Sequence, residues 1–384
     1  MARFLSRDRF GAPQLAALLM LALFAAQSLW LMAASPMSPS QAALLARGLA
    51  QWQQGHINVQ DPYRSPLYYL LASLPIANQH GPDDPAALQV RRWQVRLPWL
   101  IFGLLLGASI WYVARRLYGN AGGYIALLLY CFSPLMIAEA ASYYVQPEVT
   151  AVWGAFGAIF TSIAVAHTLY APRRVLWNWR RILLLGLSLA LAIGSQFSLW
   201  VLLPMALAFL FYLAPGRRAA ALAIFGAGCA VAFVILWAAY SFSFAGLSAG
   251  LHRAAFWDVT WEALRLPFAY KELLVRLVRT SPALLIFVPW ALITFIVWPR
   301  SRYFGNAAPL IVAAVFLFLG LITPHQPGQG FELVAMPILF VFVAGVLADL
   351  LEGKQRQIVL GIVVGLLAAY IVWSVTSLGR IGRF

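Results

Sequence analysis

Five ionisable residues carry charges that the general charge pattern of the chain does not account for. They are Asp61, Arg64, Glu139, Glu148 and Glu332, each in a turn or at the end of an apolar stretch. A carboxylate in such a place can act as a general base, and an arginine can hold a phosphate. Charged groups beside apolar segments are costly, so they more often line a cavity than face lipid. Asp61, Glu148 and Glu139 are therefore candidate catalytic residues, and Arg64 and Glu332 are candidate binding residues.

Each of these side chains also has an ordinary explanation. Asp61 precedes a proline and can start a turn while pairing with nearby Arg64. Glu148 heads an apolar stretch, where a helix N-terminus favours a carboxylate. Glu139 closes a helix, where a negative charge opposes the helix dipole, so it has either a function or a buried partner. The sequence leaves these alternatives open.

Four further residues complete the set of candidate binding groups: Tyr68, Tyr143, Gln146 and His325. Tyr143 also lies where an aromatic belt is expected, and His325 lies with Glu332 in either a ligand cavity or an ordinary polar turn. The histidines are scattered and make no metal-ligand set, so no metal site is predicted, and a divalent cofactor is left open. Cys131 and Cys229 lie in apolar runs and are expected to be small core residues.

The elements that position these groups must be membrane helices. Of the 384 residues, 62% are hydrophobic and only 10% are charged, against about 25% charged in a soluble protein. Lipid is therefore the natural solvent, and the backbone must satisfy itself in helices or closed barrels. Barrel strands would alternate over about ten residues, whereas the apolar runs here are long and continuous. The composition predicts an all-α, polytopic integral membrane protein.

About eleven stretches fit the length of roughly 20 apolar residues that a crossing helix requires. They are 12–34, 97–114, 120–138, 148–170, 182–196, 197–213, 220–240, 282–298, 305–322, 333–351 and 357–376. The stretch 12–34 is too long for the core of a signal peptide, so we expect a retained first helix. Between 182 and 213 the only polar break is Gly194-Ser195-Gln196.

The excess of basic residues indicates topology. The net charge is +15, from 27 Lys and Arg against 12 Asp and Glu. Basic pairs recur in alternate short turns, which by the positive-inside rule places the N-terminus on the cytoplasmic side. We expect the membrane to be a bacterial inner membrane. Anionic lipids are the expected partners of these charges, including the outside cluster at Arg91, Arg92 and Arg96. No nucleic-acid motif is present.

Two long outside loops, 35–96 and 241–281, contain amphipathic stretches and are expected to lie in the membrane interface. In the first loop, Ser38-Pro39-Ser40-Gln41 is typical of a helix start with a capping box, and Gly55 is typical of a helix end. Leu45, Leu49 and Trp52 share one face of that helix, and Arg47, Gln51 and Gln54 lie elsewhere. Pro66 begins a second short helix. We predict one transmembrane domain over 1–384.

The motifs of residues 36–215 follow a recognisable order. After the helix that ends at Gly55 come a Pro-rich linker and Arg64-Ser65-Pro66-Leu67-Tyr68-Tyr69-Leu70-Leu71. Then come Arg96-Leu97-Pro98, Arg115-Arg116-Leu117-Tyr118-Gly119, Ser133-Pro134-Leu135 and Gln146-Pro147-Glu148. In order and spacing they resemble the GT-C class of membrane glycosyltransferases, nearest to its protein O-mannosyltransferase and aminoarabinose transferase branch.

The resemblance implies transfer of a sugar from a polyprenyl-phosphate carrier to an acceptor on the outer face of the membrane. A glycosyl phosphate already has a good leaving group, so such an enzyme needs one base and a cation near the phosphate. In that branch an Asp-Glu pair opens the first loop helix, and its Asp is the base. Here Ser40-Gln41 occupies those positions, and Arg64 replaces a His of the linker motif.

Two functions follow from this departure. Either the chain is a glycosyltransferase in which Asp61 or Glu148 replaces the usual base, or it is a catalytically inactive relative. The inactive relative would bind lipid or scaffold partner subunits in the membrane. A secondary transporter would need broken midplane helices and repeats, and the sequence shows neither.

Overall fold

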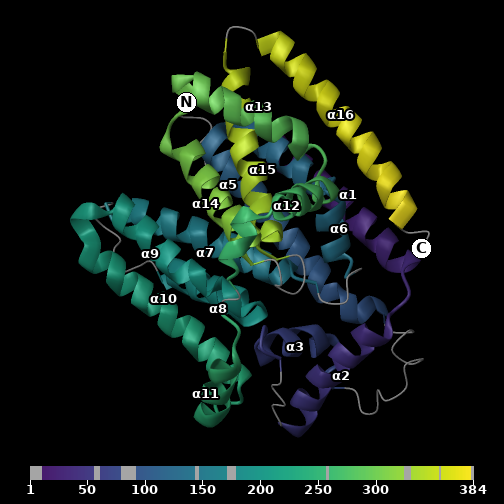
Figure 1. Ribbon diagram of the computed structural model, residues 1–384, viewed down its shortest axis with the longest axis vertical. Coiled ribbons are helices and arrows are strands. Elements are labelled where there is room, and N and C mark those ends of the chain that lie inside the picture. The colour runs from purple at the N-terminus through teal and green to yellow at the C-terminus, as the bar shows by residue number, and fades with distance from the viewer. Residues whose placement is uncertain are drawn as a thin grey trace. The chain divides into compact units, whose positions relative to one another are not determined.

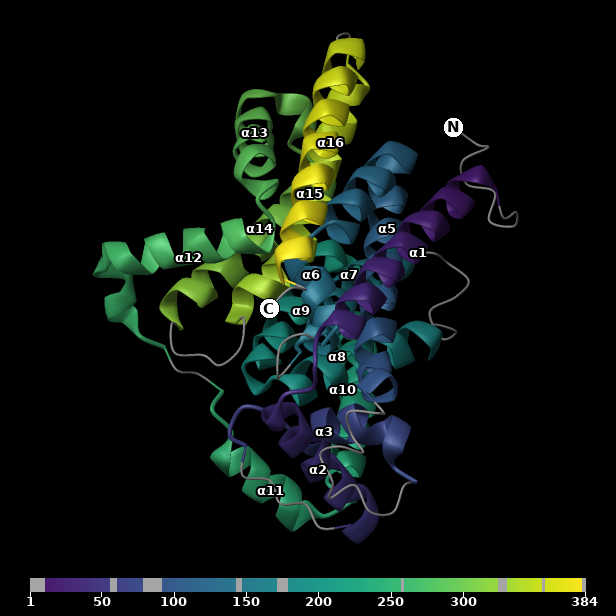
Figure 2. The same cartoon turned by 90° about the vertical axis from the view of Figure 1, so that its right-hand side faces the viewer.

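The computed structural model describes residues 11–55, 61–78, 92–142, 147–170, 179–256, 259–323, 330–353 and 356–381. Every regular element in these ranges is a helix, which confirms the all-α class (Figure 1 and Figure 2). The α-helices are α1 (Ala12–Ala34), α2 (Pro39–Gln54), α3 (Pro66–Ser73), α5 (Arg92–Cys131), α6 (Pro134–Ala140), α7 (Val149–Thr168), α8 (Trp179–Ser195), α9 (Leu202–Leu213), α10 (Arg218–Ala239), α11 (Phe244–Arg253), α12 (Pro267–Thr280), α13 (Leu284–Val297), α14 (Phe304–Ile322), α15 (Gly330–Leu351) and α16 (Arg356–Ile381).

Seven helices of the described ranges are long and apolar enough to cross a bilayer, so the chain is a multi-pass membrane protein. They are α1, α5, α7, α10 with the turn before it, α14, α15 and α16. The predicted count of about eleven is not reached. Three predicted spans are short helices instead, because α8 has 17 residues, α9 has 12 and α13 has 14. Two more predicted spans fall largely within the 40 residues of α5.

α5 holds two helical pieces that meet at Gly119, where φ is 76°. The sequence predicted a turn at this glycine, and only a residue without a β-carbon enters that backbone region at little cost. The second piece ends at Cys131, and α6 starts separately at Pro134. Since proline has no N–H to give, it suits this first helical position and divides the predicted span 120–138.

The helices form two compact units, each assembled from separate stretches of the chain. Unit 1 comprises Met1–Ser35, Gly103–Tyr144 and Val259–Phe384, and unit 2 comprises Pro36–Phe102 and Val145–Asp258. In unit 2, α8 packs against both α7 and α10, and α2 packs against α3. In unit 1, α14 and α15 pack along each other, and most of α15 is buried. One transmembrane domain over 1–384 stays a prediction.

α2 begins and ends as predicted. The Ser38 side chain accepts from the backbone N–H of Gln41, the Gln41 side chain accepts from that of Ser38, and Gly55 closes the helix at φ 63°. The expected faces are only partly right. Leu45 and Leu49 are buried, but Trp52 is exposed.

Gln51 corrects the predicted polar face of α2. It is buried, and its Nε2 donates to the carbonyl oxygen of Ala239 at 2.7 Å. The helical pattern of α2 by itself placed this glutamine away from the apolar face. The carbonyl of Ala239 at the end of α10 has no partner within its own helix, and Gln51 supplies the donor.

The close crossing of α2 and α3 depends on Gly48. A β-carbon at this position would lie 2.3 Å from the carbonyl oxygen of Tyr69 and 2.3 Å from Oγ of Ser73. No side chain fits at such distances, so glycine is what lets α2 rest directly on α3. This contact places α3, which carries Tyr68 and Tyr69, against α2.

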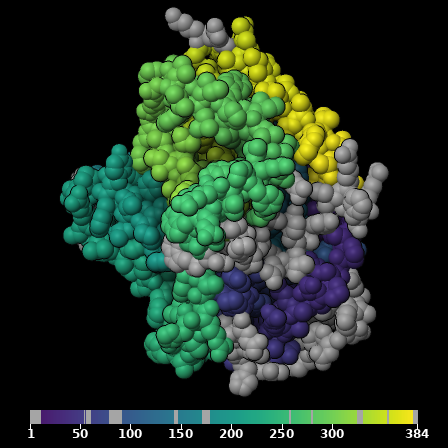
Figure 3. Space-filling model, in the orientation of Figure 1, coloured from purple at the N-terminus to yellow at the C-terminus, as the bar shows by residue number. Residues whose placement is uncertain are grey.

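Both long loops contain short helices, and those of the first loop were predicted. α2 and α3 lie within 35–96, and α11 and α12 lie within 241–281. α12 is at the surface of unit 1, with Phe268, Tyr270 and Leu274 exposed (Figure 3). Exposed apolar and aromatic side chains on a short helix are typical of a helix that lies in the membrane interface. That location for the two loops stays a prediction.

Candidate functional site

The linker between α2 and α3 is fixed by backbone hydrogen bonds to the break between α8 and α9. The carbonyl oxygen of Gly194 accepts from both the backbone N–H and the hydroxyl of Ser65, at 2.9 and 2.8 Å. On the other side, the N–H of Phe197 donates to the carbonyl of Tyr63 at 2.9 Å. The predicted break at residues 194–196 is therefore confirmed, and the linker is hydrogen-bonded to this segment.

Gly194 leaves room for this approach. A β-carbon there would lie 2.8 Å from Leu67 and 3.1 Å from Oγ of Ser65. The carbonyl of Gly194 belongs to the last turn of α8, where carbonyl groups have no partner within the helix. Ser65 supplies that partner twice, and so the position of Arg64, the residue before it, is set by the end of α8.

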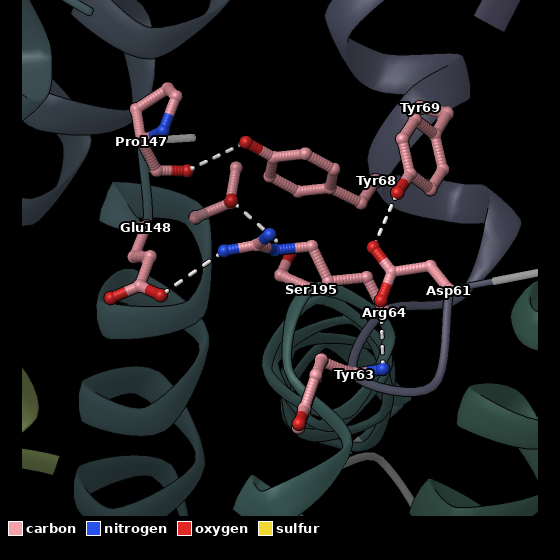
Figure 4. Close-up of polar contacts among 9 residues, drawn as sticks. Asp61, Tyr63, Arg64, Tyr68, Tyr69, Pro147, Glu148 and Ser195 are labelled. Atoms are coloured by element: carbon pink, nitrogen blue, oxygen red, sulfur yellow. Dashed lines mark hydrogen bonds and ion pairs between the residues drawn. The ribbon is translucent and has the colours of Figure 1, made fainter. Parts of the chain in front are cut away.

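Arg64 forms a buried ion pair with Glu148. Its Nη2 lies 3.2 Å from Oε1 of Glu148, and the two side chains are only 4% and 3% exposed (Figure 4). The guanidinium also stacks over the ring of Tyr68, 4.9 Å from the ring centre. Removing one member of such a pair leaves an uncompensated buried charge, which typically costs about 3–5 kcal/mol. Two of the predicted site residues, far apart in sequence, thus meet in unit 2.

Glu148 is the N-cap residue of α7, but its side chain makes no capping hydrogen bond. The carboxylate is turned toward Arg64 instead (Figure 4). The residue before it also contacts α3, because the Tyr68 hydroxyl donates to the carbonyl of Pro147 at 3.2 Å. The head of α7 is therefore tied to the linker through Arg64 and to α3 through Tyr68.

Asp61 stands at the start of the same linker and is half-buried. One carboxylate oxygen accepts from the backbone N–H of Tyr63 at 2.8 Å, which is the turn predicted for Asp61-Pro62. The other oxygen accepts a hydrogen bond from the Tyr69 hydroxyl. Both carboxylate oxygens of Asp61 are thereby oriented, one by Tyr63 before Arg64 in the sequence and the other by Tyr69 after it.

The charged groups around Arg64 shift the pKa values of Tyr69 and of Arg64 itself. Burial raises the pKa of Tyr69 to about 12, and the hydrogen bond and charge of Asp61 add to the rise, whereas the nearby Arg47 opposes it. Burial alone would lower the pKa of Arg64, but the charges of Tyr68, Glu148 and Asp61 outweigh that effect and raise it. Arg64 is therefore a permanent cation at neutral pH, and Tyr69 is a permanent donor.

A neighbouring polar contact joins the ends of α7 and α8. The Ser195 hydroxyl donates to Oγ1 of Thr150 at 3.1 Å. Both residues are buried. Sequence reasoning did not select Ser195, Thr150, Tyr69 or Arg47. The tyrosine repeat in the linker motif and the polar break at 194–196 were the available signals for two of these positions.

The first turn of α2 holds no acid. Ser40 is exposed, and Gln41 is buried with its Oε1 accepting from Nη2 of Arg96 at 3.2 Å. Arg96 also donates to the carbonyl of Pro36 at 3.1 Å. Arg96 was expected to meet lipid head groups. It is buried instead and holds the start of α2 against α5, while Arg91 lies outside the described residues.

The remaining candidates belong to unit 1 or are not described. Glu139 is buried in α6, and Glu332 is buried in α15 with Oε1 3.5 Å from Nη1 of Arg276. Arg276 also pairs with Glu272 at 2.6 Å. The structure thus gives Glu332 an ion-pair partner that the sequence did not suggest. Three predicted binding residues lie outside the described residues: Tyr143, Gln146 and His325.

Within the described ranges no three His, Cys, Asp or Glu side chains gather closely enough to hold a metal ion. What the cluster of unit 2 does offer is a fixed cation, a half-buried carboxylate and hydroxyl donors beside them.

Comparison with known proteins confirms the resemblance to GT-C membrane glycosyltransferases. The family model of dolichyl-phosphate-mannose-protein mannosyltransferases matches residues 86–242. No match was found among curated protein sequences. Because the family model covers less than half of the chain, the wider resemblance rests on the fold.

Two solved membrane proteins share that fold. ArnT from Cupriavidus metallidurans, bound to undecaprenyl phosphate, is similar with a TM-score of 0.61 and 14% identity, over 88% of this chain and 60% of that one. The oligosaccharyltransferase of Archaeoglobus fulgidus is similar with a TM-score of 0.59 and 12% identity, over 96% and 56%. The chain therefore spans about 60% or less of the length of these proteins.

Proposed function

We propose that this chain is a GT-C-like glycosyltransferase that moves a sugar from a polyprenyl-phosphate carrier to an acceptor on the outer face of the membrane. The observation that carries the proposal is the buried Arg64–Glu148 pair, with Asp61 at the start of the same linker. Support comes from the likeness to a protein bound to undecaprenyl phosphate. Of these three residues, Glu148 lies within the stretch 86–242 that the mannosyltransferase family model matches.

In this proposal Arg64 binds the phosphate of the carrier. An arginine presents several N–H donors in a plane that suits phosphate oxygens, and its raised pKa keeps it charged. Glu148 compensates that charge when no phosphate is present and holds the guanidinium in place. Since Glu148 is itself ion-paired and stands at a helix N-terminus, its role is to position Arg64 rather than to accept a proton.

Asp61 is then the general base. It takes the proton of the acceptor hydroxyl while that oxygen bonds to the anomeric carbon of the sugar. The bond between this carbon and the phosphate oxygen breaks, and polyprenyl phosphate leaves with the electron pair, stabilised by Arg64. Tyr69 and the N–H of Tyr63 orient the carboxylate for this step.

The test is sugar transfer from a polyprenyl-phosphate sugar by purified protein in detergent or nanodiscs. Asp61→Asn and Glu148→Gln should each lower the rate, with Asp61→Asn the more severe, since general-base loss typically costs about 10²–10⁴-fold. Glu352→Gln is the matched control, because its pair with Arg300 is largely exposed. Unchanged transfer in both site variants would reject the assignment.

A second function is favoured by one specific observation. The helix turn that bears the acidic pair in the resembling branch carries Ser40 and Gln41, and Gln41 is committed to Ser38 and Arg96. A catalytically inactive relative that binds a polyprenyl lipid or scaffolds partner subunits would have this property. It predicts that undecaprenyl phosphate binds tightly while no lipid-linked sugar is turned over, with or without added divalent cations.

The proposed location is the bacterial inner membrane with a cytoplasmic N-terminus. Support comes from the distribution of basic residues along the chain. Single cysteines placed at Ser40 and at Arg302 should react with a membrane-impermeant thiol reagent from opposite sides of oriented vesicles. Labelling of both from the same side would reject this topology.

A further inference from the structure

Gln196 is a buried amide without a hydrogen-bond partner among the described residues. Its side chain belongs to a residue that is 5% exposed, and both Oε1 and Nε2 are buried without a donor or an acceptor. Almost all buried polar side chains in folded proteins are hydrogen-bonded, because an unpaired one loses its water without compensation. An amide with both ends unmet therefore calls for a ligand.

The backbone places Gln196 beside Arg64. The Gly194 carbonyl bonds to Ser65, and the N–H of Phe197 bonds to Tyr63. Arg64 lies between the two linker residues of this pairing, and Ser195 and Gln196 lie between the two partner residues. Its own backbone is extended, with φ −155° and ψ 108°, so it belongs to neither α8 nor the following turn. The amide is thus carried by the segment that holds the linker.

The residues on either side of Gln196 are engaged in other contacts. Phe197 follows Gln196 and packs against Phe256, with ring centres 5.8 Å apart. Ser195 precedes it and gives its hydroxyl to Thr150. A polar side chain between an aromatic contact and a committed hydroxyl is expensive to keep unless something else meets it.

The chemistry of an amide selects the kind of ligand. Its oxygen accepts and its nitrogen donates, so it complements a hydroxyl, which does both. It carries no charge and is a weaker phosphate ligand than the adjacent guanidinium. A glycosyl phosphate offers both groups: a phosphate for Arg64 and, close to it, the hydroxyls of the sugar.

We propose that Gln196 is a specificity-determining residue that binds a hydroxyl of the transferred sugar while Arg64 holds the phosphate. The proposal rests on the proposed function. A site that hydrogen-bonds a substrate hydroxyl discriminates strongly against ligands that lack it. Gln196 therefore makes the site bind a glycosylated carrier in preference to the bare polyprenyl phosphate.

The test compares the binding of two kinds of lipid to the full chain in detergent. The probes are undecaprenyl phosphate and its mannosyl, glucosyl and aminoarabinosyl forms, titrated while thermal unfolding is recorded. Gln196→Met keeps the side-chain volume and removes the hydrogen-bonding groups. It should weaken binding of the preferred glycosylated lipid by about tenfold or more and leave undecaprenyl phosphate unchanged.

Two further variants keep the result interpretable. Gln27→Met is the matched control: Gln27 is an amide of α1 whose Oε1 is also buried without a partner, and it lies in unit 1. It should alter neither affinity. Gln196→Asn retains an amide one methylene shorter, and should fold even if the methionine variant does not, with the same selective loss for the glycosylated lipid.

The outcomes separate this inference from the proposed function. Equal tenfold losses for both lipids, or no loss for either in Gln196→Met, would overturn the sugar contact while the transferase proposal stands; the amide would then be met by ordered water only. A wild-type chain that binds none of the glycosylated lipids better than undecaprenyl phosphate would overturn both.

Discussion

Glu148 occupies the N-cap of α7, yet its carboxylate makes no capping hydrogen bond and instead lies 3.2 Å from Nη2 of Arg64. The two residues are 84 positions apart in the sequence. A side chain that would stabilise a helix end is thus used to hold a buried cation on a neighbouring linker. This arrangement makes the pair a stability feature as well as a site feature.

Arg64→Met should strongly destabilise the protein, because Glu148 would remain charged and buried. The expected loss in the free energy of unfolding is about 3–5 kcal/mol. Adding Glu148→Leu should return most of that loss, since an apolar pair replaces the ion pair. Chemical unfolding in detergent measures both. The exposed pair serves as the control, and Arg300→Gln should cost less than about 1 kcal/mol.

Tyr69→Phe should lower the turnover of sugar transfer and leave the KM for the lipid-linked donor almost unchanged. The hydroxyl orients Asp61 but does not contact the proposed phosphate ligand. Loss of one such hydrogen bond costs about 0.5–1.5 kcal/mol, which is several-fold in rate. A larger change in KM than in kcat would show that Tyr69 acts on binding instead.

The same tyrosine should contribute a pH-dependent stability. Burial and Asp61 raise its pKa from 10.0 to about 12, so the folded state holds the phenolic proton more tightly than the unfolded state. This contribution is fully present below pH 10 and is lost as the pH rises through about 12. The stability difference between wild type and Tyr69→Phe should therefore narrow over that range. A constant difference would argue against the raised pKa.

Gly194→Ala should disturb the linker. The added β-carbon would lie 2.8 Å from Cδ2 of Leu67 and 3.0 Å from Cδ2 of Leu236, and these side chains would have to shift. Overpacking of this kind typically costs about 1–3 kcal/mol. Gly226→Ala in α10 is the matched control, because nothing lies within 4 Å of its β-carbon position. There the helix propensity of alanine should add up to about 1 kcal/mol of stability.

Gln41→Ala should weaken two contacts at once, the capping box with Ser38 and the bond from Arg96. A cost of about 1–2 kcal/mol is expected for the cap and the buried donor together. Gln41→Glu keeps the capping box and places a charge beside Arg96, so its stability should equal or exceed that of wild type. If Gln41→Ala unfolds like wild type, neither contact contributes measurably.

Local signals in the sequence were enough to find several features of the fold. The capping box at Ser38, the helix end at Gly55, the turn at Gly119 and the break after Gly194 all depend on a few adjacent residues. Their physical causes are steric or involve hydrogen bonds within one turn, so they can be read without knowing what packs where.

Other features depend on contacts between distant segments and were not predictable. No local pattern joins Arg64 to Glu148, or Gln51 to the end of α10. The predicted count of about eleven spans is not shown, because α8, α9 and α13 have 17, 12 and 14 residues and are shorter than the roughly 20 that a crossing helix requires. Asp61 was selected on type alone, and the tyrosine that bonds to it became visible only with the turn of α3.

The carbonyl group of Gly194 limits which sequence changes the linker can accept. Gly194 accepts two hydrogen bonds from the single residue Ser65, and Phe197 reaches back to Tyr63. The backbone hydrogen bonds at Tyr63 and Ser65 fix how many residues lie between these two anchors. The length of the segment 63–65 is therefore fixed, and inserting or deleting one residue there would move the guanidinium of Arg64 off Glu148 even if Asp61, Arg64 and Ser65 were all retained.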